Sequence, residues 1–329
     1  MLHEATLHYL RTRKNLLAFS GGGDSAALFF LLLEHHIPFD IAHVNYQTRD
    51  QSNEEERYAK MLAQRYGKDV FTTTIHLASN NFEHHARKVR YDFFETLVKE
   101  KRYNTLLMAH HLGDQLEWFL MQLCKGAGLV ELLGMREYET KEEYTLVRPL
   151  LHLDKSQLHA YLIANDIVFF EDESNKDPKY LRNRFRHQFS TPLLQEYAHG
   201  IARSFAYLEA DRSLLEHYPC QQLHDMYLIR KEIDDVRNMR AIDYVLKRLG
   251  KVLSKEEREE VLRTKECVVG GKFAICFQKE FIFIAPYVQE KMPKSFKELC
   301  RKNHIPPKIR PYLYRFSILP QMLHSHQIP

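Results

Sequence analysis

A glycine-rich loop at residues 20–25 constrains this chain more than any other feature of its sequence. The loop reads S-G-G-G-D-S, follows the apolar run 16–19 and precedes the apolar, helix-length segment 26–36. Glycines let a backbone turn sharply and approach a ligand without a Cβ clash. Free N–H groups at the start of a helix bind anions. A strand, such a loop and a helix in succession therefore predict a phosphate site.

The side chains of the loop indicate which phosphate chemistry is involved. The phosphate-binding residues that we expect here are Ser20, Gly21, Gly22, Gly23, Asp24 and Ser25. The two serines supply hydroxyl donors, whereas Asp24 would repel a phosphate unless a cation lay between them, which predicts Mg²⁺. No Gly-Lys-Ser/Thr ending makes this a Walker A motif, and Ser25 replaces the third glycine of a dinucleotide fingerprint. The alternative, a flexible turn, does not require two serines and an aspartate.

Strand-like and helix-like segments alternate around this loop. Short apolar or β-branched segments, expected to be strands, lie at 16–19, 39–44, 70–75 and 105–109. Helical patterns lie between and after them at 26–36, 52–66, 82–99 and 114–124. Such alternation is typical of βαβ units and a parallel sheet, and strands that are apolar almost throughout fit a sheet buried on both faces. The first part of the chain is thus predicted to be α/β.

The length of 329 residues favours more than one domain. We expect a first domain at 1–200, a mainly helical region at 201–265, and a small basic unit at 266–329. A hairpin is expected around Gly270 and Gly271, and basic residues recur between 294 and 315. The 47 basic and 43 acidic residues leave a net charge of only +4, so nucleic-acid binding would require clustered positive charge.

Several classes of protein are disfavoured. The five cysteines form no C-x-x-C pair, so we expect neither a metal site nor a disulfide framework, and a reducing cytoplasm is the default location. The longest apolar run is far shorter than a bilayer span, and the first residues do not resemble a secretory signal. A soluble cytoplasmic protein is therefore predicted.

Four further motifs follow the glycine loop in a fixed order. They read HVNYQTR at 43–49, ARKVRYDFF at 86–94, AHHLGDQLE at 109–117, and EDESNKD at 171–177 with RNRFR at 182–186. With the loop, they resemble the PP-loop ATP pyrophosphatase superfamily, and within it the tRNA(Ile)-lysidine synthetases. The sequence departs from that pattern at Gly113, where an aspartate is usual, at Trp118, where a threonine is usual, and at Tyr46, where a histidine is usual.

The resemblance implies an adenine nucleotide alpha hydrolase-like fold and a C–N ligase reaction. It also implies that residues 1–200 are the catalytic domain, 201–265 a helical linker domain and 266–329 a small α+β unit that contacts tRNA. ATP would adenylate the carbonyl oxygen at carbon 2 of the wobble cytidine in a CAU-anticodon tRNA(Ile), releasing pyrophosphate. The ε-amine of free L-lysine would then attack that carbon and AMP would leave, which changes codon reading from AUG to AUA. The implied cofactors are ATP and Mg²⁺, and the implied partners are this tRNA and lysine, with no membrane.

The resemblance also implies roles for residues at matching positions. ATP would be held by the glycine loop together with His43 and Asn45. The catalytic set would be Asp24, His111, Asp114 and Glu117. The residues expected to contact tRNA or phosphate are Arg87, Arg90, Arg182, Asn183 and Arg186.

The chemistry of these side chains fits such roles, although each pattern has a plainer interpretation. Asp114 and Glu117 are three residues apart, so on a helix they share one face. Together they could bind the lysine ammonium, and one could accept its proton. An exposed acidic pair is the alternative, as a solvated helix face is for Arg87 and Arg90. His111 could orient the substrate or be structural.

Two other functions remain open from the sequence. A tRNA 2-thiolating PP-loop enzyme would generally need cysteine pairs or Fe–S ligands, and Cys124 is the only cysteine in the expected catalytic domain. A tRNA-binding protein that has lost catalysis is suggested only by Gly113, and the complete glycine loop argues against it.

Overall fold

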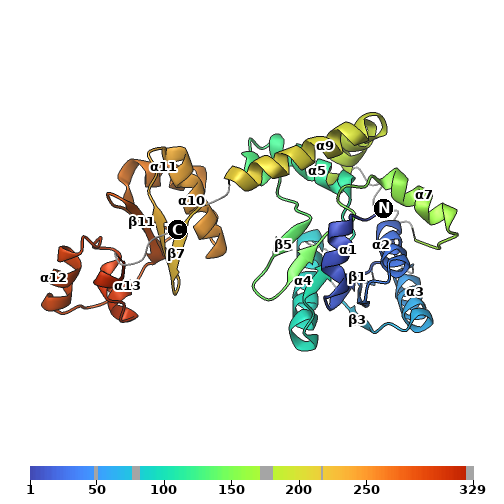
Figure 1. The fold of residues 1–329 in the computed structure, drawn as a ribbon, viewed down its shortest axis with the longest axis horizontal. Helices are drawn as coiled ribbons and strands as arrows, with labels where there is room; N and C mark the ends of the chain where they lie inside the picture. Colours follow the sequence, from blue (N-terminus) through green and yellow to red (C-terminus); the bar gives the residue numbers. More distant parts are fainter. Residues whose placement is uncertain (48–50, 76–81, 171–180, 216–217, 324–329) are drawn as a thin grey trace. The chain divides into compact units, whose positions relative to one another are not determined.

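The computed structural model describes residues 1–47, 51–75, 82–170, 181–215 and 218–323 and divides into two compact units, Met1–Leu214 and Leu215–Pro329 (Figure 1). The helices of the first unit are α1 (Glu4–Arg11), α2 (Gly23–Glu34), α3 (Gln51–Tyr66), α4 (Phe82–Lys101), α5 (Leu112–Leu123), α6 (Leu129–Leu132), α7 (Lys155–Ala164), α8 (Leu181–Phe185), the π-helical turn η2 (Arg186–Ser190) and α9 (Thr191–Leu215). Its strands are β1 (Asn15–Ala18), β2 (Phe39–Asn45), β3 (Val70–Thr74), β4 (Thr105–Leu107), β5 (Tyr138–Thr140) and β6 (Thr145–Val147). The expected α/β fold is confirmed.

The strands of the first unit form one sheet in the order β3-β2-β1-β4-β6-β5. All neighbours are parallel except β5, which pairs antiparallel with β6. The chain adds β2 and β3 on one side of β1 and then crosses to place β4 on the other side. The carboxyl ends of β1 and β4 therefore border the switch point of strand order, where α/β sheets bind their ligands.

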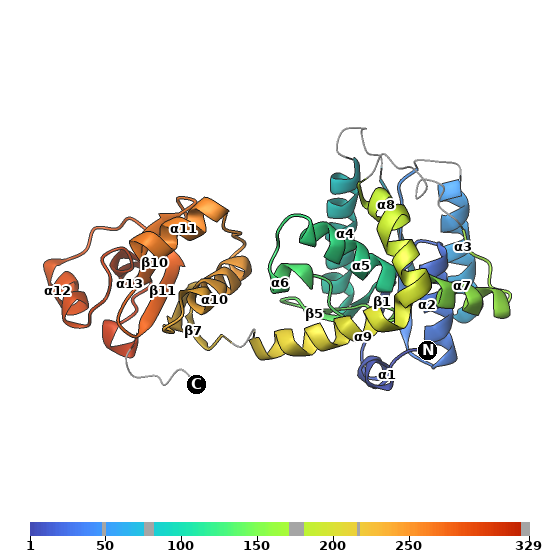
Figure 2. The same cartoon turned by 90° about the horizontal axis from the view of Figure 1, so that it is seen from above.

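Helices cover both faces of the sheet of the first unit. Successive strand residues point to opposite faces, so neighbouring residues of one strand pack into two different core clusters. Leu17 and Leu107 pack with α1, α2, α3 and α7 in one core cluster. Their neighbours Leu16 and Leu106 pack with α4 in another. Figure 2 shows α2, α3 and α7 on one side of β1 and α4 on the other. This double burial explains the apolar strands.

The second unit is built on an antiparallel sheet in the order β7-β8-β11-β10-β9. Its elements are β7 (Cys220–Leu223), β8 (Met226–Arg230), α10 (Asp235–Arg248), α11 (Lys255–Thr264), β9 (Glu266–Val269), β10 (Phe273–Phe277), β11 (Phe281–Pro286), α12 (Lys294–Lys302), α13 (Arg310–Arg315) and the 3₁₀ turn η3 (Pro320–Leu323). One core cluster joins the sheet to α10 and α11, and another joins it to α12 and α13. The hairpin expected around Gly270 and Gly271 is confirmed by the pairing of β9 with β10.

The unit limits differ from the expected divisions at residues 200 and 265. The range expected to form a helical linker contains α10 and α11 but also β7 and β8, and β8 pairs with β11 along residues 227–230. This pairing joins the expected linker to the expected C-terminal unit in one sheet. Helix α9 continues to Leu215, which moves the division beyond residue 200. Among the described residues, no helix has the length and apolar character needed to cross a membrane.

Candidate active site

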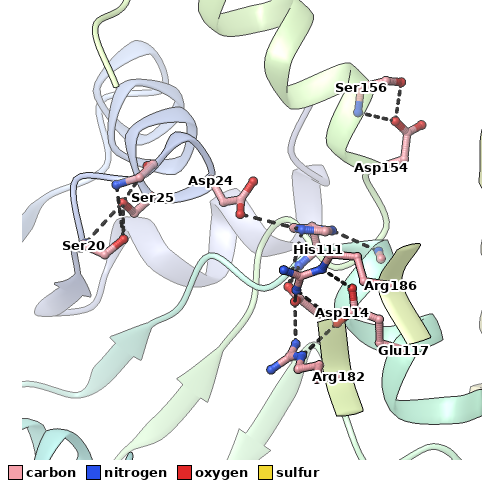
Figure 3. A network of polar contacts seen from close by, with 12 residues as sticks. Ser20, Asp24, Ser25, His111, Asp114, Glu117, Asp154, Ser156, Arg182 and Arg186 are labelled. Carbon is pink, nitrogen blue, oxygen red and sulfur yellow. Dashed lines mark hydrogen bonds and ion pairs between the residues drawn. The ribbon is translucent and has the colours of Figure 1, made fainter. Parts of the chain in front are cut away.

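The glycine loop and the start of α5 bring the expected catalytic residues together at the switch point of the first unit. The loop follows β1, and His110 and His111 follow β4. Because β1 and β4 are parallel neighbours, their carboxyl ends open on the same edge of the sheet. Figure 3 shows Asp24 and Asp114 on either side of His111, with Glu117 close by.

The glycine loop is held in place by bonds among its own residues. The Ser25 hydroxyl donates to Gly22 O at 2.9 Å, lies 3.1 Å from Ser20 Oγ, and accepts from Ser20 N at 3.2 Å. Gly21 has φ of +88°, a conformation that favours glycine, and its carbonyl accepts from Phe170 N at 3.1 Å. These bonds fix the position of the loop at the first turn of α2.

Asp24 lies in the first turn of α2, with its side chain 36% exposed. Burial raises the pKa of Asp24, and the nearby Asp114 raises this pKa further. A bound cation would offset the free energy that burial adds to the charged form of this carboxylate. Mg²⁺ prefers carboxylate oxygens and usually takes one or two of them beside substrate phosphates. An accessible carboxylate at an anion-binding helix start fits such an ion, so Asp24 could hold Mg²⁺.

His111 caps the N-terminus of α5 with its imidazole ring. Nδ1 accepts from Gly113 N at 3.0 Å, and the His111 backbone N–H donates to Asp114 Oδ2 at 3.0 Å. The opposite ring nitrogen, Nε2, lies 3.7 Å from an oxygen of Asp24 and 3.7 Å from one of Asp114. The ring therefore lies between the glycine loop and the two carboxylates Asp114 and Glu117, called the acidic pair below.

Arg182 and Arg186 form ion pairs with the acidic pair. Glu117, only 1% exposed, accepts from Arg182 Nε at 2.8 Å and from Arg186 at 2.6 and 3.1 Å. Arg182 also donates to Asp114 Oδ1 at 2.6 Å. Burial by itself would raise the pKa of Asp114, but the Arg182 guanidinium and the bond from the His111 backbone N–H hold it well below its usual range. Both carboxyl groups are thus held by cations of the chain itself.

The sequence did not identify Arg148, which fixes a second histidine of the site. Arg148 is 5% exposed and donates from Nε to His110 Nδ1 at 3.2 Å. The guanidinium is held in turn by Glu139 at 3.0 Å and by the Arg136 carbonyl at 2.7 Å. Burial lowers the pKa of His110 to about 4. Because Nδ1 accepts a bond, this ring is neutral with its proton on Nε2.

The low pKa of His110 predicts a pH-dependent stability. The unfolded chain binds a proton near pH 6.5 and the folded chain only near pH 4, so stability falls as the pH drops between these values. The full difference corresponds to about 3 kcal/mol. Chemical denaturation of the wild type and of His110→Asn at pH 7 and pH 4.5 would measure it, and the variant should lose much less stability than the wild type.

A histidine far from this environment provides the control for that measurement. His36 is exposed and follows α2 with φ of +54°, which asparagine adopts readily. His36→Asn should retain the full pH dependence of the wild type. Equal pH dependence in His110→Asn and wild type would contradict the assignment.

The other expected site residues lie around this centre. The side chain of His43, 1% exposed, bonds Phe19 O at 3.0 Å through Nδ1, and its Nε2 has no partner among the described residues. Asn45 donates to Asn53 and Glu56 at 3.0 and 2.8 Å, so its amide braces the end of β2 against α3.

The expected tRNA contacts are divided between two places. Arg87 is exposed on α4 and stacks over Tyr91 at 4.8 Å, and Arg90 lies one turn further along the same helix. Asn183 is 7% exposed on α8, between the two arginines that bind the acidic pair. The EDESNKD motif at 171–177 lies outside the described residues.

Comparison with known proteins agrees with this arrangement. Residues 2–193 match the model of the PP-loop domain family. A tRNA(Ile)-lysidine synthase of Wolinella succinogenes is 49% identical over 94% of this chain and 95% of its own length. One from Helicobacter pylori is 44% identical over 94% and 91%. The solved structure of a U34-tRNA thiolase from Methanococcus maripaludis matches 68% of this chain and 78% of its own with a TM-score of 0.53 at 16% identity, which shows a shared fold.

Proposed function

The chain belongs to the tRNA(Ile)-lysidine synthase family of PP-loop enzymes, which are C–N ligases, and we propose that it joins lysine to the wobble cytidine of a CAU-anticodon tRNA(Ile). ATP use follows from the family. The finer assignments are our proposal: Mg²⁺ as the metal, free L-lysine as the nucleophile, and adenylation of the carbonyl oxygen at carbon 2. The observation that carries them is the meeting of Asp24, His111, Asp114 and Glu117 at one switch point.

The glycine loop would hold the phosphates of ATP. The N–H groups in the first turn of α2 and the hydroxyls of Ser20 and Ser25 are donors for phosphate oxygens. Mg²⁺ bound by Asp24 would neutralise phosphate charge as pyrophosphate leaves. His43 Nε2, a buried acceptor behind the loop, supports a place for the adenosine near the end of β2.

The acidic pair would receive the lysine. An ammonium has a pKa of about 10.4 and is not a nucleophile until it loses a proton. The low pKa of Asp114 keeps this group anionic, which suits binding of the cation. Glu117 is the deeper carboxylate and is anchored by Arg182 and Arg186, so we propose that it fixes the geometry of the pair while Asp114 faces the ammonium.

Measurement of AMP release tests this function. The purified protein would be incubated with ATP, Mg²⁺, a CAU-anticodon tRNA(Ile) transcript and each amino acid in turn. We expect release that requires both the tRNA and lysine, with a covalently attached lysine detected by mass spectrometry of the digested tRNA. Release with a sulfur donor in place of lysine would instead indicate a thiolase, and no release would indicate a protein that only binds tRNA.

A thiolase is not favoured by the site. Cys124, the only cysteine of the first unit, is exposed at the far end of α5, ten residues beyond Asp114. No second thiol of the unit exists to pair with it, and the described residues contain no cluster of metal-ligating side chains. The likeness to the U34-tRNA thiolase structure, which holds a [4Fe-4S] cluster, is therefore a likeness of fold alone.

A further inference from the structure

The position of Gly113 is unusual for a glycine. It lies buried in the first turn of α5, and its φ is not in the left-handed region that only glycine adopts freely. Glycine in a helix is less stable than alanine by about 1 kcal/mol. Backbone conformation therefore does not explain this residue, and another cause must be sought in its surroundings.

The imidazole of His111 occupies the space that a side chain at position 113 would need. A Cβ built on Gly113 would lie 2.7 Å from Cε1 and 3.0 Å from Nδ1 of His111. Real Cβ atoms do not approach other atoms so closely, and the ring itself is confined, being only 5% exposed. A side chain at 113 would therefore require the ring to shift from the position that it takes in this chain, which departs from the family pattern here.

The displaced ring would lose the bond that fixes its protonation pattern. Nδ1 accepts from Gly113 N at 3.0 Å, so the proton of the neutral ring is on Nε2. Nε2–H is then directed into the space between Asp24 and Asp114, 3.7 Å from an oxygen of each (Figure 3). Histidine is not among the side chains that commonly cap helices. The capping bond at Nδ1 has the effect of orienting Nε2, on the opposite side of the ring, toward the two aspartates.

We propose that Gly113 is a positioning residue that locks His111 as an Nε2–H donor between the nucleotide loop and the acidic pair. At 3.7 Å from an oxygen of each, this N–H makes no hydrogen bond to either carboxylate, but its positive end lies between Asp24 on α2 and Asp114 on α5 and attracts both. Reacting groups must be held within about an ångström for full activity. The kinetic part of this proposal rests on the proposed function.

The first test reads the tautomer directly. Imidazole ¹⁵N spectra of the whole protein would be recorded at pH 7.5, and the signals that disappear in His111→Asn identify the ring. We expect a protonated Nε2 and an unprotonated, hydrogen-bonded Nδ1 in the wild type, and a shift of both signals in Gly113→Ala. A proton on Nδ1 in the wild type, or unchanged signals in Gly113→Ala, would overturn the proposal.

The second test is kinetic. Gly113→Ala should lower kcat for AMP release by about tenfold or more, because the donor is misplaced, with little change in KM for tRNA. Its melting temperature should fall only modestly, because the gain in helix propensity offsets part of the cost of displacing a buried ring and losing a cap. The matched control is Gly200→Ala in α9, where an added Cβ meets nothing within 4 Å, and its kinetics should equal those of the wild type.

A double-mutant cycle shows whether Gly113 acts through His111. In the His111→Asn background the clash is absent and asparagine caps the helix, so Gly113→Ala should cost nothing further. An equal loss in both backgrounds would overturn the proposal. If the wild type released no AMP, the proposed function would fail, while the tautomer measurement would still decide the role of Gly113.

Discussion

Replacing Glu117 with glutamine should destabilise the protein by about 2 kcal/mol and raise the KM for lysine far more than the KM for ATP. The carboxylate is 1% exposed and accepts three bonds from Arg182 and Arg186. Loss of its charge leaves two guanidinium groups facing one neutral amide. Breaking a buried pair costs about 3–5 kcal/mol, but these arginine side chains are 42% and 20% exposed, so solvent screens part of the cost.

Urea denaturation and steady-state kinetics would measure the two effects of Glu117→Gln. Glu298→Gln is the matched control, because Glu298 pairs with Arg301 at 2.8 Å but both side chains are exposed. Such a surface pair contributes at most about 1 kcal/mol, so the control should be nearly as stable as the wild type. A Glu117→Gln protein with wild-type stability would show that the arginines do not depend on this carboxylate.

Local patterns were sufficient to predict the sheet and the loop. The strands at 16–19, 39–44, 70–75 and 105–109 were recognisable because a doubly covered sheet requires continuous apolar runs, and all four are present within two residues of the expected limits. The assignment of Asp24 and Asp114, ninety residues apart in the sequence, to one site came from the resemblance to the tRNA(Ile)-lysidine synthetases. The parallel pairing of β1 with β4 explains why the two residues lie together.

Contacts between distant polar residues could not be predicted in the same way. Arg182 and Glu117 are 65 residues apart, and nothing in the basic run around Arg182 distinguishes an arginine that binds phosphate from one that binds a carboxylate. The π-helical turn that begins at Arg186 has no reliable sequence signal, although such turns frequently occur at functional sites. The burial of Arg148 beside His110 depends on β5 and β6, whose short strands carry little pattern.

The second unit shows the same limit. Its hairpin was predicted because Gly270 and Gly271 separate two alternating segments. The strands β7 and β8 were not, because each has only four or five residues and β8 gains its partner β11 more than 50 positions later. Non-local pairing outweighed the helical pattern of the flanking segments, which is common for short strands.

Replacing Asp24 with asparagine should reduce AMP release by at least about 100-fold while leaving the protein as stable as the wild type or more so. The raised pKa of Asp24 means that the folded state disfavours the carboxylate. The stability that this group contributes is therefore present below its unfolded pKa and lost as the pH rises through its folded pKa. At neutral pH the uncharged asparagine amide removes the cost of keeping a buried carboxylate charged. The variant should therefore lose activity without losing stability.

Asp154→Asn supplies the control for this comparison. Asp154 caps α7 in the same unit, accepting from Ser156 N at 2.7 Å and from Gln157 N at 3.1 Å, and asparagine caps helices about equally well. This variant should match the wild type in both activity and melting temperature. Retention of AMP release by Asp24→Asn would remove Asp24 from the proposed Mg²⁺ site. A large loss of stability would show that the carboxylate supports the fold instead of the reaction.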